Sequence, residues 1–339
     1  MIKAFVSGCS GPQLTTYEIG FFRDEAPWGL ILFARNIQTP DQVLELTTEF
    51  RRAVGRDDAP VLVDQEGGRV QRLRPPHWRK YPAAKVYGDL YLRDAEAGLR
   101  AAWLGARLIA GDLQPLGITV DCLPCLDVRF PDTVDAIGDR AFSTDPDVVA
   151  DLGKAMVEGA LAGGVLPVIK HIPGHGRARV DSHLELPRVD AGHSSLESVD
   201  FRPFKALSRV SLGMTAHIVY TDIDAERPGT HSAKIIRGII RETIGFDGCL
   251  MSDDISMKAL GGTIDERSRA IIEAGCDIVL HCNGDLEEMR AVAAAVPELS
   301  GKAGERCEAA LSGLRVPDPE FDGREAWNEF QSLTGWQGV

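Results

Sequence analysis

The sequence predicts an α/β fold of the (β/α)8 barrel type, and three observations carry this prediction. Eight short apolar runs alternate with helix-like segments, and the last run ends near residue 282. This length is typical of a (β/α)8 barrel and favours it over an open doubly wound sheet. Polar residues directly follow several of the runs, as on the carboxyl-terminal face where such barrels carry their active sites.

The individual elements are placed by their apolar periodicity and by their start and stop signals. Thr15 and Glu18 have capping-box spacing and open the first helix, whereas Asp145 and Pro146 open a helix that runs to about residue 162. Gly275 should end the helix at residues 265–274. We expect strands at residues 2–6, 29–34, 61–63, 118–123, 165–169, 212–219, 248–252 and 278–281. Further helices are expected at residues 41–54, 95–115, 201–207, 233–243 and 286–295.

The domain organisation follows from where this alternation stops. Residues 1–299 should form a single catalytic barrel domain. Residues 300–339 are polar and contain Trp327 and Trp336, so we expect a C-terminal extension packed on the outside of the barrel.

Composition limits the classes of partner and the cellular compartment. The 339 residues carry a formal net charge of −13, which argues against nucleic acid or an anionic membrane surface as the main partner. The apolar run that precedes Cys9 is too short for a signal peptide, and nowhere do about 18 uninterrupted apolar residues occur. The expectation is a soluble cytoplasmic enzyme.

The seven cysteines are odd in number and mostly lie in apolar runs, as free buried thiols of a reducing compartment would. Cys122 and Cys125 form a C-x-x-C sequence, but there is no second such pair, so neither a redox couple nor a zinc site is the favoured interpretation.

Ionisable residues cluster after the fifth apolar run. Three histidines, a lysine and an aspartate fall within fourteen residues, from Lys170 to His183. Asp181 and His183 are two residues apart, so in an extended loop both side chains point to one side. The carboxylate can then hold one ring nitrogen and leave the other free for proton transfer. A single histidine is more often structural, but the cluster favours a general acid/base.

Other polar residues follow other strands. Asp253 directly follows the seventh strand and is placed to act as a nucleophile, whereas Asp254 fits a role in capping the next turn. The segment from Asp64 to Arg69 places donors and acceptors on a glycine-rich turn, which suits either several sugar hydroxyls or a structural ion-pair loop. Further polar candidates on the same face are Arg72, Arg140, Lys170, His171 and His217.

Neither a cofactor nor a metal is expected. The sequence has no phosphate-loop or dinucleotide fingerprint. His171, His175 and His183 could in principle hold a metal, but no histidine precedes His77, unlike the usual zinc hydrolase barrel with its His-x-His on the first strand.

Six motifs in this order resemble the bacterial β-N-acetylglucosaminidases of glycoside hydrolase family 3, the cytoplasmic enzymes of peptidoglycan recycling. The resemblance runs from about residue 5 to 285 and is more specific than any one motif. Its motifs are Val63–Val70, Gly138–Phe142, Lys170–Gly176, Asp181–His183, Met214–His217 and Ser252–Asp254.

The resemblance implies roles for particular residues. Asp253 would be the nucleophile, and His183 the acid/base with Asp181 as its partner. Sugar-binding roles would fall to Asp64, Arg72, Arg140, Lys170 and His171. This sequence departs from the family pattern at Ile172, where many members have Phe, and Arg177 and Arg179 lie in a variable stretch.

The implied reaction is retaining hydrolysis of a terminal β-linked N-acetylglucosamine through a glycosyl-enzyme. The implied substrate is a small carbohydrate or muropeptide, N-acetylglucosamine joined to 1,6-anhydro-N-acetylmuramic acid. Two alternatives remain, a phosphorylase on the same fold and a sugar-binding barrel without catalysis. The sequence does not indicate an oligomeric state.

Overall fold

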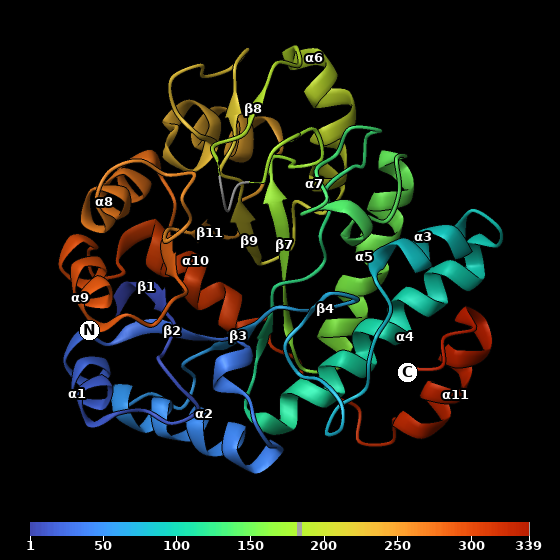
Figure 1. The fold of residues 1–339 in the computed structure, drawn as a ribbon, viewed down its shortest axis with the longest axis horizontal. Coiled ribbons are helices and arrows are strands. Elements are labelled where there is room, and N and C mark those ends of the chain that lie inside the picture. Colours follow the sequence, from blue (N-terminus) through green and yellow to red (C-terminus); the bar gives the residue numbers. More distant parts are fainter. Residues whose placement is uncertain (182–184, 339) are drawn as a thin grey trace.

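A closed barrel of eight parallel strands forms the centre of the computed structural model, which describes residues 1–181 and 185–338 (Figure 1). Strand β1 pairs with both β2 and β12 and so closes the barrel. The (β/α)8 prediction is confirmed. In order around the barrel the strands are β1 (Lys3–Ser7), β12 (Ile278–His281), β11 (Cys249–Asp254), β9 (Leu212–Thr215), β7 (Leu166–Ile172), β6 (Val120–Asp121), β3 (Val61–Val63) and β2 (Pro27–Leu32).

Helices surround the barrel, and two small sheets lie on its connecting loops. The longer helices are α1 (Thr16–Glu25), α2 (Pro40–Val54), α3 (Ala84–Tyr91), α4 (Ala95–Leu113), α5 (Pro146–Ala162), η6 (Lys234–Thr243), α8 (Ile264–Ala274), α9 (Leu286–Ala295), α10 (Gly301–Ser312) and α11 (Gly323–Thr334). The short ones are η1 (Ala34–Asn36), η2 (Gln114–Leu116), η3 (Gly138–Arg140), α6 (His193–Ser195), η4 (Leu196–Asp200), α7 (Arg202–Ala206) and η5 (Gly229–His231). Strands β4 (Gln65–Gly67) and β5 (Val70–Gln71) pair antiparallel, and β8 (Arg188–Val189) pairs in parallel with β10 (Val219–Tyr220).

The capping signals act as the sequence predicted. Thr15 Oγ1 accepts from the backbone N of Glu18 at 3.2 Å, while Glu18 Oε2 accepts from the backbone N of Thr15 at 2.8 Å. The side chain of Asp145 caps α5, and Gly275, with φ of 114°, ends α8. Only glycine adopts such a φ without strain, which explains the sharp stop.

Some element boundaries differ from the predictions. Helix α3 was not predicted, because its N-cap residue Ala83 provides no side-chain cap and hence no start signal. Strand β7 continues to Ile172, past the apolar run, and so carries Lys170 and His171 itself. Strand β9 ends at Thr215, short of the predicted residue 219.

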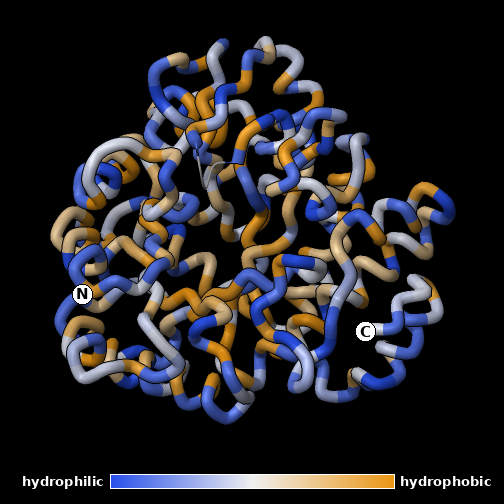
Figure 2. The backbone as a smooth tube through the Cα atoms, in the orientation of Figure 1, coloured by the Kyte–Doolittle hydropathy of each residue, from blue (hydrophilic) through white to orange (hydrophobic). Residues whose placement is uncertain are grey.

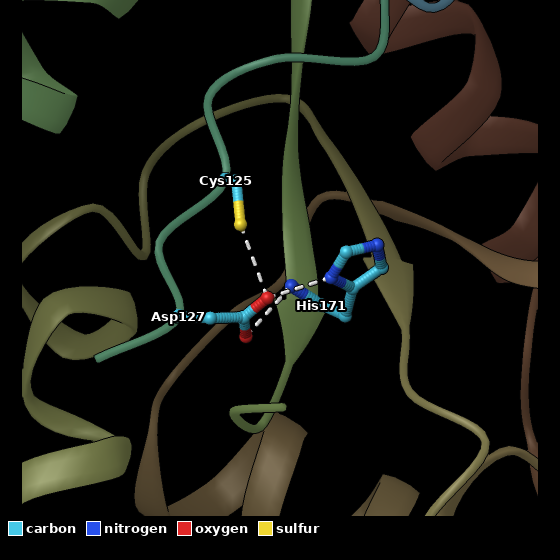
Figure 3. A group of neighbouring side chains, drawn as sticks. All are labelled: Cys125, Asp127 and His171. Carbon is cyan, nitrogen blue, oxygen red and sulfur yellow. Dashed lines mark hydrogen bonds and ion pairs between the residues drawn. The ribbon is translucent and has the colours of Figure 1, made fainter. Parts of the chain in front are cut away.

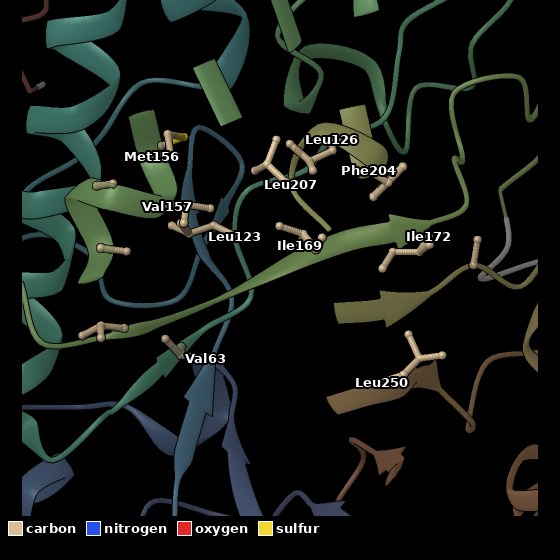
Figure 4. Close-up of a cluster of buried hydrophobic side chains, with 14 of the residues drawn as sticks. Val63, Leu123, Leu126, Met156, Val157, Ile169, Ile172, Phe204, Leu207 and Leu250 are labelled. Atoms are coloured by element: carbon tan, nitrogen blue, oxygen red, sulfur yellow. The ribbon is translucent and has the colours of Figure 1, made fainter. Parts of the chain in front are cut away.

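Apolar side chains fill both faces of the strands, as expected for a parallel sheet covered on both sides. Figure 2 shows hydrophobic segments along the barrel strands and hydrophilic segments at the outer rim. Alternate residues of β7 point in opposite directions: Val168 belongs to the cluster inside the barrel, and Ile169 to the cluster outside it. In Figure 4 Ile169 and Ile172 lie near Leu126, Phe204 and Leu207.

The last two helices pack at different places. Helix α11 lies against α4 on the outside, and the ring centroid of its fully buried Phe330 is 6.2 Å from that of Tyr87 in α3 (Figure 1). Helix α10 instead contributes Cys307 and Ala310 to the cluster inside the barrel, and Cys307 Sγ is 3.2 Å from Cys249 Sγ at the start of β11. Helix α11 thus lies on the side of the barrel, whereas the apolar edge of α10 covers its amino-terminal end. The domain boundary at residue 299 stays a prediction.

All seven cysteines are buried free thiols, as the sequence indicated. Cys122 and Cys125 accordingly form no disulfide. Among the described residues, none of the helices combines the length and apolar character needed to cross a membrane.

Candidate active site

A pocket of about 300 Å³ lies at the carboxyl-terminal ends of the strands. It receives side chains from the loops after β3 and β7, from the segment after β5, from η3, and from β7 and β11 themselves. His183, the expected acid/base, lies outside the described residues. The other seven predicted site residues all line the pocket: Asp64, Arg72, Arg140, Lys170, His171, Asp181 and Asp253.

Lys170 is the centre of an ion-pair network on one wall of this pocket. Its Nζ lies 2.9 Å from Asp64 Oδ1 and 2.6 Å from Glu66 Oε1, and its side chain is only 2% exposed. Arg72 Nη2 contacts Asp64 Oδ2 at 3.0 Å. Arg140 binds Glu66 through two parallel hydrogen bonds of 2.8 Å each. Three cations and two carboxylates thus hold one another in fixed positions.

The network keeps both carboxylates ionised. Burial acts to raise the pKa of Asp64, but the charges of Lys170 and Arg72 outweigh it and hold that pKa well below its usual range. Burial likewise opposes the ionisation of Glu66, yet Arg140 and Lys170 lower its pKa to about 2. Such rigid charged acceptors and donors suit the hydroxyl groups of a sugar ring.

Glu66 lies within the Val63–Val70 motif, but the sequence indicated no role for it. Glu66 follows Asp64 by two residues and lies in β4. Its side chain contacts Lys170, as that of Asp64 does. The spacing of Asp64 and Glu66, two residues apart at the end of a strand, is the signal that could have found it.

Asp127 organises a second network behind the pocket, and sequence reasoning missed it entirely (Figure 3). Its Oδ2 accepts from His171 Nδ1 at 2.7 Å and from Cys125 Sγ at 3.1 Å. Its Oδ1 accepts from the backbone N of His175 at 2.6 Å. The signal was a lone aspartate in the apolar stretch after the fourth strand, 44 residues from His171 in sequence.

The same three side chains have the composition of a metal site, with candidate ligand atoms of Cys125, Asp127 and His171 within 4.8 Å of one another. Their separations of 2.7 and 3.1 Å are those of hydrogen bonds. Burial, with the charge of Asp127, raises the pKa of the Cys125 thiol well above its usual value, so the thiolate that binds metal is disfavoured. We therefore interpret this group as a hydrogen-bond network.

His217 supports the strand end that carries the expected nucleophile. Its Nε2 lies 3.0 Å from the carbonyl oxygen of Asp254, and its Nδ1 lies 2.8 Å from Thr230 Oγ1. Burial lowers the pKa of His217, so the ring is neutral and donates through Nε2 to that carbonyl. His217 thus has a structural part at the rim of the barrel.

The paired aspartates at the end of β11 differ as their positions suggested. Asp254 accepts from the backbone N of Ser256 at 3.0 Å and from its hydroxyl at 2.6 Å, and so caps the following turn. It also accepts from the backbone N of Cys282 at 3.2 Å, which ties β11 to the end of β12. Asp253 lines the pocket, and its Oδ1 accepts from the backbone N of Asp254 at 2.8 Å.

The loop that follows β7 is held at several described points. Arg177 Nε pairs with Asp200 Oδ2 at 2.7 Å, and its guanidinium lies 4.1 Å from the Phe130 ring centroid. Gly176 approaches the carbonyl oxygen of Val128 so closely that a Cβ there would lie only 1.8 Å from it. This loop leads directly to Asp181.

Comparison with known proteins agrees with this geometry. The profile of the glycosyl hydrolase family 3 N-terminal domain matches residues 23–312. A β-hexosaminidase of Alkalilimnicola ehrlichii is 36% identical over 352 residues, covering 99% of this chain and 94% of that protein. A β-hexosaminidase of Methylococcus capsulatus is 42% identical over 278 residues, covering 80% of each.

Solved structures show the same relationship. NagZ from Neisseria gonorrhoeae, in complex with N-trifluoroacetyl-D-glucosamine, superposes with a TM-score of 0.87 at 31% identity, covering 98% of this chain and 97% of that one. A family 3 β-N-acetylglucosaminidase from Paenibacillus sp. gives a TM-score of 0.84 at 27% identity, over 97% of this chain and 66% of that one. The chain therefore belongs to glycosyl hydrolase family 3, within which it is a β-N-acetylhexosaminidase.

Proposed function

We propose that this hexosaminidase is a retaining exo-enzyme that releases terminal β-linked N-acetylglucosamine from peptidoglycan fragments in cell-wall recycling. The observation that carries the proposal is that Asp253 shares one small pocket with the ionised network around Lys170. The N-acylated glucosamine bound by the neisserial relative supports the choice of sugar.

The size of the pocket supports removal of one terminal residue at a time. A volume of about 300 Å³ is at the lower end for ligand pockets and suits a single sugar ring. Asp64, Lys170 and Arg140 would hold its hydroxyls, and the leaving sugar would extend toward the loop that carries Asp181.

The mechanism we propose has two steps. A carboxylate oxygen of Asp253 attacks the anomeric carbon, and the bond to the leaving oxygen breaks as His183 transfers a proton to that oxygen. In the second step His183 takes a proton from water, whose oxygen displaces Asp253 and yields N-acetylglucosamine with retained configuration. Asp181 would orient the imidazole through both steps.

The physiological substrate in this proposal is N-acetylglucosamine linked to 1,6-anhydro-N-acetylmuramic acid, and the compartment is the cytoplasm. Seven buried free thiols and a net charge of −13 fit a soluble protein of a reducing compartment. Purified enzyme should hydrolyse such muropeptides faster than chitobiose, and a strong preference for chitobiose would contradict the recycling role.

The nucleophile is tested by replacing Asp253 with alanine. Turnover of 4-nitrophenyl N-acetylglucosaminide should fall by about 10³-fold or more, because the covalent step has no other route. Asp89→Ala, which removes a half-exposed surface carboxylate, is the matched control and should keep wild-type rates. Activity that survives in Asp253→Ala would remove this residue from the role.

The acid is tested with leaving groups of different quality. His183→Ala should slow glycosylation strongly for a poor leaving group but little for a nitrophenolate, which departs without protonation. Equal losses for both would mean that another residue is the acid. Product analysis in phosphate buffer completes the test, since N-acetylglucosamine 1-phosphate would indicate a phosphorylase, and binding without turnover a non-catalytic barrel.

A further inference from the structure

The fully buried carboxylate of Asp127 contacts the imidazole of His171. His171 lines the pocket, whereas Asp127 is 0% exposed and is not one of the lining residues; Figure 3 shows the two side chains facing one another. One oxygen of Asp127 is 2.7 Å from His171 Nδ1. The other oxygen is 2.6 Å from the backbone N of His175 and 3.4 Å from that of His171.

The two backbone contacts require Asp127 to accept a hydrogen, whereas the direction of the contact with His171 Nδ1 depends on which partner carries the proton. The Cys125 thiol and two backbone N–H groups donate to this carboxylate, and hydrogen bonds of that kind favour its ionised form. An ionised carboxylate has no hydrogen to donate. The atom 2.7 Å away, Nδ1 of His171, must therefore carry the proton in this contact.

We propose that Asp127 is a positioning residue: whenever the His171 ring carries a single proton, Asp127 keeps that proton on Nδ1, so that Nε2 meets the substrate as a hydrogen-bond acceptor. The part that involves substrate rests on the proposed function. The same carboxylate holds the backbone N of His175, so it also fixes the start of the loop that leads to Asp181. One buried group thus aligns the ring and the loop.

Asp127→Asn reverses this arrangement without changing the size of the side chain. Two backbone N–H groups point to the position of Oδ1 and select the amide oxygen there. The amide nitrogen then takes the place of Oδ2, 2.7 Å from His171 Nδ1. Because that nitrogen donates, Nδ1 must accept, and the ring proton moves to Nε2.

The tautomer can be measured without substrate by nitrogen-15 NMR on protein labelled at histidine, under conditions where the rings are neutral. The chain has eight histidines, and His171→Ala assigns the signals of interest. Wild-type protein should show a protonated Nδ1, and Asp127→Asn a protonated Nε2. An unprotonated Nδ1 in the wild type would overturn the proposal even if the variant failed to fold, and so would a protonated Nδ1 in folded Asp127→Asn.

The catalytic consequence is measured as kcat/KM on 4-nitrophenyl N-acetylglucosaminide. In Asp127→Asn the protonated Nε2 of His171 would face a hydrogen-bond donor of the substrate, so kcat/KM should fall by about 5- to 150-fold. Cys125→Ala, which removes another contact of the same oxygen but keeps its charge, is the matched control and should lose less than about 3-fold. In a His171→Ala background, Asp127→Asn should have only a small further effect, because its action passes through that ring.

Two kinetic results would contradict the proposal: a reversed tautomer with kcat/KM equal to that of Cys125→Ala, or a full loss that persists in the His171→Ala background. The second would mean that Asp127 acts by general support of the fold. Failure of the proposed function is distinguishable, since it would show as an inactive wild-type enzyme whose His171 tautomer is still as stated.

Discussion

Replacing Lys170 with methionine should destabilise the protein far more than the same replacement at Lys85. Both ammonium groups lie 2.6 Å from a carboxylate oxygen, that of Glu66 and that of Asp89 respectively. They differ in burial, because the Lys170 side chain is 2% exposed and that of Lys85 is 42% exposed. The two variants therefore compare a buried lysine with an exposed one whose ion pair has the same length.

The expected magnitudes follow from that difference. Removing one partner of a buried pair leaves uncompensated charge in a medium of low polarity and costs about 3–5 kcal/mol. Here Asp64 and Glu66 both lose Lys170, although Arg72 and Arg140 remain to bind them. Losing an exposed pair four residues apart on a helix costs about 0.3–0.5 kcal/mol.

The effect should depend on pH with a definite sign. The folded-state pKa values of Asp64 and Glu66 are lowered, that of Glu66 to about 2. Their stabilisation is therefore complete above the unfolded-state values of about 4 and is lost as the pH falls toward the folded-state values. Without Lys170 these carboxylates take up protons more readily in the folded protein. The stability that Lys170→Met loses relative to wild type should therefore decrease as the pH falls.

Chemical denaturation followed by tryptophan fluorescence provides the assay, with wild type, Lys170→Met and Lys85→Met compared at about pH 7 and pH 4. The loss of unfolding free energy in Lys170→Met, relative to wild type, should be complete at about pH 7 and clearly smaller at about pH 4. A deficit below about 1 kcal/mol, or one that is equal at both pH values, would refute the argument from burial.

Two further predictions concern the loop after β7 and the last helix. Gly176→Ala should displace the loop and lower kcat/KM, since its Cβ would lie 1.8 Å from the carbonyl oxygen of Val128; Gly238→Ala, with open space around it, should keep activity. Equal activities of the two variants would contradict the tight contact. Phe330→Ala should lower the free energy of unfolding by about 3–5 kcal/mol, because this side chain is fully buried against Tyr87. A separate early transition for α11 in denaturation curves, with the barrel unaffected, would instead support an independent extension.

Much of the fold was predictable because its signals are local. Parallel strands buried on both faces appear as continuous apolar runs, and caps such as Thr15 with Glu18 mark helix starts within a few residues. The pocket was predictable for a related reason: parallel strands end at the same rim, so residues after different strands, such as Asp64 and Asp253, must meet there.

The contacts within the site were not predictable, because they join distant parts of the chain. Lys170 meets Asp64 across 106 positions, and His171 meets Asp127 across 44, with no local pattern that pairs them. The packing of α10 was not predictable either. Its amphipathic sequence indicates that one edge is buried, but it does not indicate the surface against which that edge packs. Local periodicity identifies which face of a helix must be buried, whereas the surface against which that face packs is known only from the assembled barrel.

Helix α10 has a consequence for the order in which the protein matures. It covers the amino-terminal end of the barrel, yet it is translated after all eight strands, by a few seconds at about 5–20 residues per second. During that interval a nascent barrel would present an uncovered apolar layer that includes Trp28, Leu166 and Cys249. Chaperones that recognise exposed apolar surface would find their target at this end, remote from the rim that carries the pocket, until residue 312 has joined the fold.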